Sequence, residues 1–244
     1  MIYEHFLSAM NEGSKLLAIL LDPDKTDDNA LIETLGKIND SIVDFIFVGG
    51  SSVEEEATNN LVLKLRNLTT LPIVLFPGHY QQITTHADAI LFLSLISGRN
   101  PEYLINQQVK AVPYIQKTAL EVIPTGYILI DGGKETAVQR VSETKPIASH
   151  DFEKITQTAI AGMYMGNKLI YLEAGSGATK PIDAAVIRSV RKKINIPLIV
   201  GGGIRSKEEL LEAYKNGADL VVIGTAFEEN IDFLTKFMKN EHIY

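Results

Sequence analysis

The sequence predicts a single-domain TIM-like (β/α)8 barrel, and three observations support this fold class. The chain has 244 residues, close to the roughly 250 residues typical of such barrels. Short apolar runs rich in β-branched residues alternate with amphipathic helical stretches along most of its length. The last two apolar runs each end in a glycine turn, Gly201-Gly202-Gly203 and Gly224-Thr225. Turns after strands seven and eight of such barrels often bind phosphate, although glycine also ends strands for turn geometry alone.

Eight segments are expected to form the parallel strands of the barrel. Each is almost continuously hydrophobic, as parallel strands covered on both faces tend to be. The segments are residues 16–21, 45–48, 72–76, 89–95, 121–130, 168–174, 197–200 and 220–223. An open, doubly wound sheet is the alternative. Its glycine fingerprint would follow the first strand, which here runs into Asp22-Pro23-Asp24-Lys25 instead.

Helices are expected between most of these strands, at residues 30–39, 53–67, 101–112, 152–165, 184–194 and 207–216. Asn100-Pro101 is a typical helix start, and Asn216-Gly217 is a typical helix end. The stretch between the third and fourth strands is short, so the helix after strand three is expected to be short or missing. No Ser/Gly-rich linker divides the chain, and the predicted barrel domain therefore spans residues 1–244.

The composition is that of an ordinary globular protein, with 45% hydrophobic and 22% charged residues. The net charge of −7 and the absence of a basic stripe argue against a nucleic-acid partner. The absence of cysteine excludes disulfides and thiolate metal sites. The first residues lack the pattern of a signal peptide, and no apolar run is long enough for a transmembrane segment. The expected location is cytoplasmic.

Active sites of such barrels lie at the carboxyl ends of the strands. The first strand ends at Asp22, whose carboxylate suits Mg²⁺, a cation that takes oxygen ligands from one or two carboxylates plus substrate phosphates. A turn that merely starts a helix is the other interpretation. After the second strand, either Ser51 or Ser52 could contact the metal or a second phosphate, or could cap a helix. His79, after the third strand, receives no role.

The sixth strand carries the strongest single motif, Tyr171-Leu172-Glu173-Ala174-Gly175-Ser176-Gly177. Alternation places Tyr171 and Glu173 on one face. If that face is the barrel interior, burial would raise the pKa of Glu173 and suit it as a general base for a hydroxyl nucleophile. The alternative is a structural glutamate that bonds to the backbone of a tight loop.

Taken together, these strand ends resemble the geranylgeranylglyceryl phosphate synthase family, which includes bacterial heptaprenylglyceryl phosphate synthases. The resemblance covers approximately residues 15–237 and is most specific at the strand-six motif and the triple glycine. It implies a prenyltransferase that uses Mg²⁺ to join the 3-hydroxyl of sn-glycerol 1-phosphate to C1 of a prenyl diphosphate, here geranylgeranyl diphosphate, through an ether bond.

The resemblance also implies roles for particular residues. Asp22 and Ser51 match the metal site, and Glu173, with Tyr171 beside it, matches the proposed base. The residues that match the sn-glycerol 1-phosphate site are Tyr171, Leu172, Glu173, Ala174, Gly175, Ser176, Gly177, Gly202, Gly203, Gly224 and Thr225. The family further implies a homo-oligomer, a dimer or a hexamer. The lipid product makes transient membrane contact an expectation.

A prenyl tail needs an apolar trench, for which Leu93, Leu95, Ile96 and Tyr103 are candidates, with Tyr103 as a gate. The sequence leaves the prenyl chain length open, and heptaprenyl specificity is an alternative. A phosphosugar isomerase that uses Asp22 and Asp131 is the main rival enzyme, because such barrels carry acidic groups after strands one and five. A non-catalytic phosphate-binding barrel is the third possibility.

Overall fold

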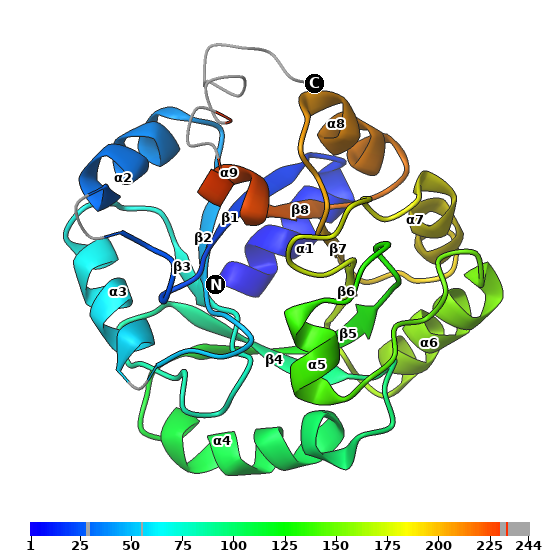
Figure 1. Ribbon diagram of the computed structural model, residues 1–244, viewed down its shortest axis with the longest axis horizontal. Helices are drawn as coiled ribbons and strands as arrows, with labels where there is room; N and C mark the ends of the chain where they lie inside the picture. Colours follow the sequence, from blue (N-terminus) through cyan, green and yellow to red (C-terminus); the bar gives the residue numbers. More distant parts are fainter. Residues whose placement is uncertain (28–29, 55, 230–232, 234–244) are drawn as a thin grey trace.

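The protein forms one closed barrel of parallel strands, seen here in a computed structural model that describes residues 1–27, 30–54, 56–229 and 233 (Figure 1). The strands are β1 (Leu16–Leu21), β2 (Phe45–Val48), β3 (Ile73–Leu75), β4 (Ala89–Leu95), β5 (Glu121–Leu129), β6 (Leu169–Glu173), β7 (Leu198–Gly201) and β8 (Leu220–Ile223). They pair in sequence order, and β8 pairs with β1 to close the ring. The predicted fold class is confirmed. Residues 234–244 of the predicted domain lie outside the described part.

Most of the helices surround the ring of strands, while α1 lies across one end of it (Figure 1). They are α1 (Ile2–Glu12), α2 (Leu31–Asp40), α3 (Ala57–Arg66), the single π-helical turn η1 (Glu102–Asn106), α4 (Gln107–Ile115), α5 (Ala137–Ser142), α6 (Phe152–Tyr164), α7 (Ala184–Arg191), α8 (Lys207–Lys215) and α9 (Thr225–Glu229). None of the helices formed by the described residues combines the length and hydrophobicity that crossing a membrane requires.

Local sequence explains several helix boundaries. The N–H of Glu102 donates to the Asn100 side chain at 3.0 Å, which confirms the predicted helix start. Ser206 and Glu209 form a reciprocal capping box at the start of α8. The helix after β2 begins at Ala57, later than expected, because Glu56 has a left-handed backbone with φ of 63°. Residues 76–88 contain no helix, as the short connection predicts.

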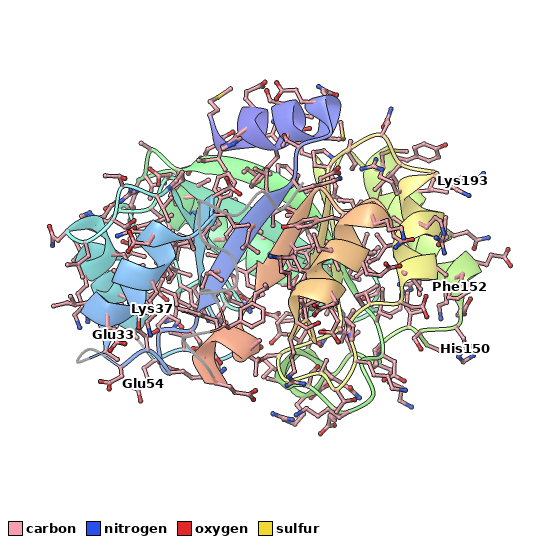
Figure 2. The ribbon with its side chains drawn as sticks, turned by 90° about the horizontal axis from the view of Figure 1, so that it is seen from above. Glu33, Lys37, Glu54, His150, Phe152 and Lys193 are labelled. Atoms are coloured by element: carbon pink, nitrogen blue, oxygen red, sulfur yellow. The ribbon has the colours of Figure 1, made fainter. Side chains whose placement is uncertain are left out.

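Sequence analysis did not anticipate α1, which closes one end of the barrel. Its buried residues Phe6 and Ala9 pack into the barrel interior, and the ring of Phe6 lies 5.0 Å from that of Phe45. The backbone N–H groups of Ile2 and Tyr3 donate to the Glu121 carboxylate at the start of β5. Figure 2 shows α1 and α9 at opposite ends of the barrel, so α1 covers the end away from the carboxyl ends of the strands.

The core has two layers, and side-chain alternation along the strands assigns residues to them. The inner layer fills the barrel and includes Leu169 and Tyr171 of β6. The outer layer lies between the barrel and the helices and includes Ile170 and Leu172 of the same strand. Glu173 is two residues beyond Tyr171, so it points inward at the carboxyl end of the barrel.

Candidate active site

A cavity of about 370 Å³ lies at the carboxyl ends of the strands. Asp22 and Ser51 line it on the side of β1 and β2. The rest of the polar rim belongs to β6, β7 and β8, of which β8 pairs with β1. The predicted site residues that line it there are Tyr171, Glu173, Ser176, Gly177, Gly202, Gly203, Gly224 and Thr225. The two groups of residues therefore face one shared cavity. A reaction between a glycerol phosphate and a prenyl diphosphate would need both anions to bind in one such space.

Glu173 is a buried carboxylate within this cavity, with only 6% of the residue exposed. Burial raises its pKa from 4.5 to about 7, since the charged form loses its hydration. The N–H of Gly175, which donates to Oε1 at 2.6 Å, and the nearby Tyr171 hydroxyl act in the opposite direction. Glu173 is thus poised to accept or release a proton near neutral pH.

The hydroxyl of Tyr171 is buried and has no hydrogen-bond partner of regular geometry within the described residues. It lies against the backbone of Gly201, where a side chain would collide with it. The same added Cβ would lie 3.0 Å from Glu173 Oε2. A buried hydroxyl without a partner, next to a buried carboxylate, can form a hydrogen bond with a substrate hydroxyl or phosphate.

The loop after β6 meets the turn after β8 through hydrogen bonds. The Gly177 N–H donates to Thr225 Oγ1 at 3.1 Å, and the Ser176 and Thr225 hydroxyls are 3.2 Å apart. Gly202 approaches the same loop from β7, and its φ of 83° favours glycine. These contacts bring the three glycine-rich segments to one corner of the cavity.

Three residues of the strand-six motif do not line the cavity. Leu172 and Ala174 belong to the outer core layer, and their side chains face away from the barrel interior. Gly175 packs against Thr136 so closely that a side chain would collide with it. Gly175 acts on the site through its N–H bond to Glu173. The three residues support the end of β6, which carries Tyr171 and Glu173, and the start of the loop that follows it.

The Asp22 carboxylate lies on the other side of the cavity and has two polar neighbours. Its Oδ1 accepts the Asp24 N–H at 3.2 Å, and its Oδ2 is 3.0 Å from Lys25 Nζ. A Cβ at Gly50 would lie 2.9 Å from Oδ1, so glycine keeps the approach to the carboxylate clear. Both Ser51 and Ser52 line the cavity.

These residues fit a magnesium ion that is held partly by substrate. Among the described residues, no three His, Asp or Glu side chains cluster as a metal site would require. One carboxylate with nearby hydroxyls supplies too few ligands for a metal cage built from protein alone. It matches the usual Mg²⁺ arrangement, in which one or two carboxylates act together with substrate phosphates and water.

Gln82 does not line the cavity but supports two turns that do, and sequence reasoning missed it. Its side chain is buried, and its Oε1 accepts the N–H groups of Gly50 at 3.4 Å and Gly78 at 3.2 Å. Its Nε2 donates to the Gly50 carbonyl at 2.9 Å. Gln82 thereby joins the turns after β2 and β3 and fixes the backbone beside Ser51.

The remaining wall of the cavity is largely apolar. The rings of Phe76 and Tyr171 stack with centroids 5.3 Å apart, and Tyr127 packs against both. Leu93, Leu95 and Tyr103 line the cavity beyond them. Ile96, the fourth trench candidate, belongs to the outer core layer instead. An elongated apolar ligand could lie along this wall.

His79, which sequence analysis left without a role, and Asp131, which only the isomerase alternative used, differ in position. His79 lines the cavity, and burial is the main cause that lowers its pKa. Asp131 is exposed and is absent from the cavity wall. Its carboxylate accepts the Gly133 N–H at 2.9 Å, which explains it as part of a turn.

The sequence matches the PcrB family over residues 12–241. The chain belongs to the PcrB family. A relative named geranylgeranylglyceryl phosphate synthase from Flavobacterium johnsoniae is 54% identical over 95% of this chain and 96% of its own length. One of the same name from Thermococcus gammatolerans is 41% identical over 93% of this chain and 89% of its own length.

A solved structure agrees with this family assignment. The crystal structure of (S)-3-O-geranylgeranylglyceryl phosphate synthase from Thermoplasma acidophilum, in complex with its substrate sn-glycerol-1-phosphate, superposes on this PcrB-family chain with a TM-score of 0.90. The two are 32% identical, and the match covers 96% of this chain and 94% of the other.

Proposed function

We propose that this prenyltransferase of the PcrB family joins sn-glycerol 1-phosphate to geranylgeranyl diphosphate. The product contains an ether bond between the 3-hydroxyl of the glycerol and C1 of the prenyl chain. The observation that carries the proposal is the single cavity lined by Asp22 and Ser51 on one side and by Glu173 and three glycine-rich turns on the other. The names of the relatives, from a bacterium and an archaeon, support the same reaction.

We assign the glycerol phosphate to the corner formed by residues 171–177, Gly202-Gly203 and Gly224-Thr225. Glycines there allow backbone N–H groups to approach an anion closely. The hydroxyls of Ser176 and Thr225 add polar hydrogens at the same place. The Thermoplasma acidophilum relative is in complex with sn-glycerol-1-phosphate, which supports this compound as the substrate. Anchoring the phosphate would hold the 3-hydroxyl in a fixed orientation toward the second substrate.

Glu173 would act as the base, with Tyr171 beside it. The O–H bond of the glycerol 3-hydroxyl breaks, and its proton moves to the Glu173 carboxylate. The oxygen forms a bond to C1 of the prenyl chain, while the bond between C1 and the diphosphate oxygen breaks with its electron pair. A pKa of about 7 keeps a large fraction of Glu173 charged at neutral pH and still allows it to hold the proton.

Asp22 and Ser51 would hold Mg²⁺ together with the diphosphate. When bound, the ion neutralises the negative charge that accumulates on the departing diphosphate. The apolar wall with Leu93, Leu95 and Tyr103 would accept the prenyl tail. The family resemblance also supports a homo-oligomer, a dimer or a hexamer, with a cytoplasmic location and transient membrane contact for the lipid product.

The isomerase alternative receives less support from the site. It needs Asp131 in the same cavity as Asp22, and Asp131 is part of an exposed turn. Heptaprenyl specificity is the second alternative within the family. It concerns only the apolar wall and leaves the ether chemistry unchanged.

One assay tests the proposal. The protein is incubated with Mg²⁺, radiolabelled sn-glycerol 1-phosphate and prenyl diphosphates of several lengths, and the lipids formed are separated by chromatography. We expect a labelled prenylglyceryl phosphate, most abundant with geranylgeranyl diphosphate, and its loss when EDTA is added. Excess Mg²⁺ should restore it. Failure to form any ether lipid with any chain length would contradict the proposed reaction, and EDTA resistance would contradict the metal.

A further inference from the structure

Lys25 is the only lysine among the described residues that line the cavity, and its ammonium group lies between two carboxylates. Its Nζ atom is 3.0 Å from Asp22 Oδ2 and 3.4 Å from Glu228 Oε2. Asp22 follows β1 and Glu228 lies in α9, so this lysine joins the segments after the first and last strands. About half of its side chain is exposed (51%), so the ammonium group can also reach a ligand.

The charges on this side of the cavity leave a diphosphate with few protein partners. Asp22, Asp24 and Glu228 all line the cavity there, and Lys25 is the cation among them. The protein groups on this side therefore carry a net negative charge, which repels a multiply charged anion. The guanidinium of Arg205, on the side of β7, donates to the Ala178 carbonyl at 3.2 Å. A diphosphate beside Asp22 would thus depend on Lys25 as well as on the metal.

We propose that the Lys25 ammonium group binds the diphosphate of the prenyl substrate alongside the metal ion, and that Glu228 positions this ammonium group. The inference rests on the proposed function, because that function assigns the diphosphate to the Asp22 side of the cavity. A lysine ammonium has three N–H donors, so it can keep one toward Glu228 and direct others to phosphate oxygens. As the bond to C1 breaks, charge accumulates on these oxygens and the interaction strengthens.

Binding of inorganic diphosphate, measured by isothermal titration calorimetry with and without Mg²⁺, tests the role of Lys25. Lys25→Met should weaken diphosphate binding about tenfold or more, because a charge-assisted contact is lost. Lys25→Arg should retain most of the affinity. Binding of sn-glycerol 1-phosphate should stay unchanged in both variants, because the polar partners of Lys25 are Asp22 and Glu228, which are not assigned to that site.

Lys37→Met is the matched control. Lys37 Nζ is 3.0 Å from Glu33 Oε1, a pair with the same separation as Lys25 and Asp22, and neither residue lines the cavity. Both are labelled in Figure 2. The control should bind diphosphate like the wild type. Diphosphate affinity in Lys25→Met equal to that of Lys37→Met would overturn the proposal. So would an equal loss of glycerol phosphate and diphosphate binding, which would indicate general distortion.

Glu228→Gln tests the positioning role. This variant keeps the Lys25 charge but loses its anchor, so the rate at saturating substrates should fall about fivefold while inorganic diphosphate binds no more weakly. An unchanged rate would overturn the positioning role. The two levels of inference fail separately. A wild-type protein that forms no ether lipid contradicts the function, whereas an active wild type with normal diphosphate binding by Lys25→Met contradicts only the Lys25 assignment.

Discussion

Glu173 combines burial, which disfavours its charge, with a proposed role that requires this charge. Burial raises its pKa from 4.5 to about 7. Folding therefore favours the protonated form, and the stability that the carboxyl group contributes is fully present below about pH 4.5. That contribution is lost as pH rises through about 7. The charged form of Glu173 that the proposed reaction needs is therefore also the form that lowers the stability of the folded protein at alkaline pH.

Glu173→Gln should separate these two effects. The turnover rate should fall by about a hundredfold or more, because no carboxylate accepts the hydroxyl proton. The free energy of unfolding above neutral pH should rise by an amount on the order of 2 kcal/mol, because no buried charge remains. Rates and urea denaturation at about pH 5 and about pH 8 measure both, with the exposed Glu208→Gln as control. Wild-type turnover by Glu173→Gln would exclude Glu173 as the base.

The pH dependence of the wild-type rate gives a second, independent measurement. If Glu173 must be deprotonated, product formation should rise with pH, with a midpoint near the pKa of about 7. Binding of sn-glycerol 1-phosphate should be recorded in parallel, because the phosphate itself titrates in this range. A rate that is flat from acidic to alkaline pH would argue against proton transfer to this group.

At the scale of elements, glycine turns bring three strand ends into contact at the proposed phosphate corner. Gly202→Ala should abolish most of the activity, because the new Cβ would lie 2.5 Å from Glu173 Oε1 and would need a φ of 83°. Gly166→Ala is the matched control. Gly166 has a similar φ of 92° but open space around its Cβ, so the control measures backbone strain alone. Equal activity in the two variants would show that the close approach of Gly202 is unimportant.

The turn η1 carries Tyr103 to the cavity wall. Removing its ring in Tyr103→Ala should let longer prenyl diphosphates bind, so the product distribution should shift toward longer chains while the ether chemistry remains. Competition between prenyl diphosphates of different lengths, followed by mass spectrometry of the lipids, measures the shift. Tyr164→Ala removes a ring that is 81% exposed and serves as control. An unchanged distribution would reject Tyr103 as the gate.

Sequence and structure agree best where local chemistry determines the element. The strands were predictable because each is a nearly continuous apolar run, and Glu173 because alternation along β6 fixes its face. The sequence could not indicate Gln82, since its role depends on contacts with Gly50, 32 residues earlier in the chain. It gave no sign of α1, because the partner of Phe6 is Phe45 on β2. Leu172 and Ala174 show the limit of motifs, which do not distinguish lining residues from supporting ones.

At the scale of the whole molecule, α1 completes the inner core from the end opposite the cavity. Phe6→Ala should lower the free energy of unfolding by about 3 kcal/mol or more, the usual cost of truncating a buried aromatic ring. Chemical denaturation measures it. Ile32→Ala, at a side chain that is 72% exposed, should change stability by less than about 0.5 kcal/mol. The folded Phe6→Ala protein should keep its activity, because α1 lies at the end of the barrel opposite the cavity. A loss of turnover in protein that is still folded would contradict this expectation.

The wall of the cavity draws on different strands for different tasks. Charged and glycine-rich segments follow β1, β2, β6, β7 and β8, whereas Phe76, Leu93, Leu95, Tyr103 and Tyr127 come from β3, β4, β5 and η1. Substitutions at Leu93, Leu95 or Tyr103 could therefore reshape the apolar arc, whereas Phe76 and Tyr127 also hold the ring of Tyr171. A different isoprenoid length would then require changes along the apolar arc only, with the polar part of the rim left as it is.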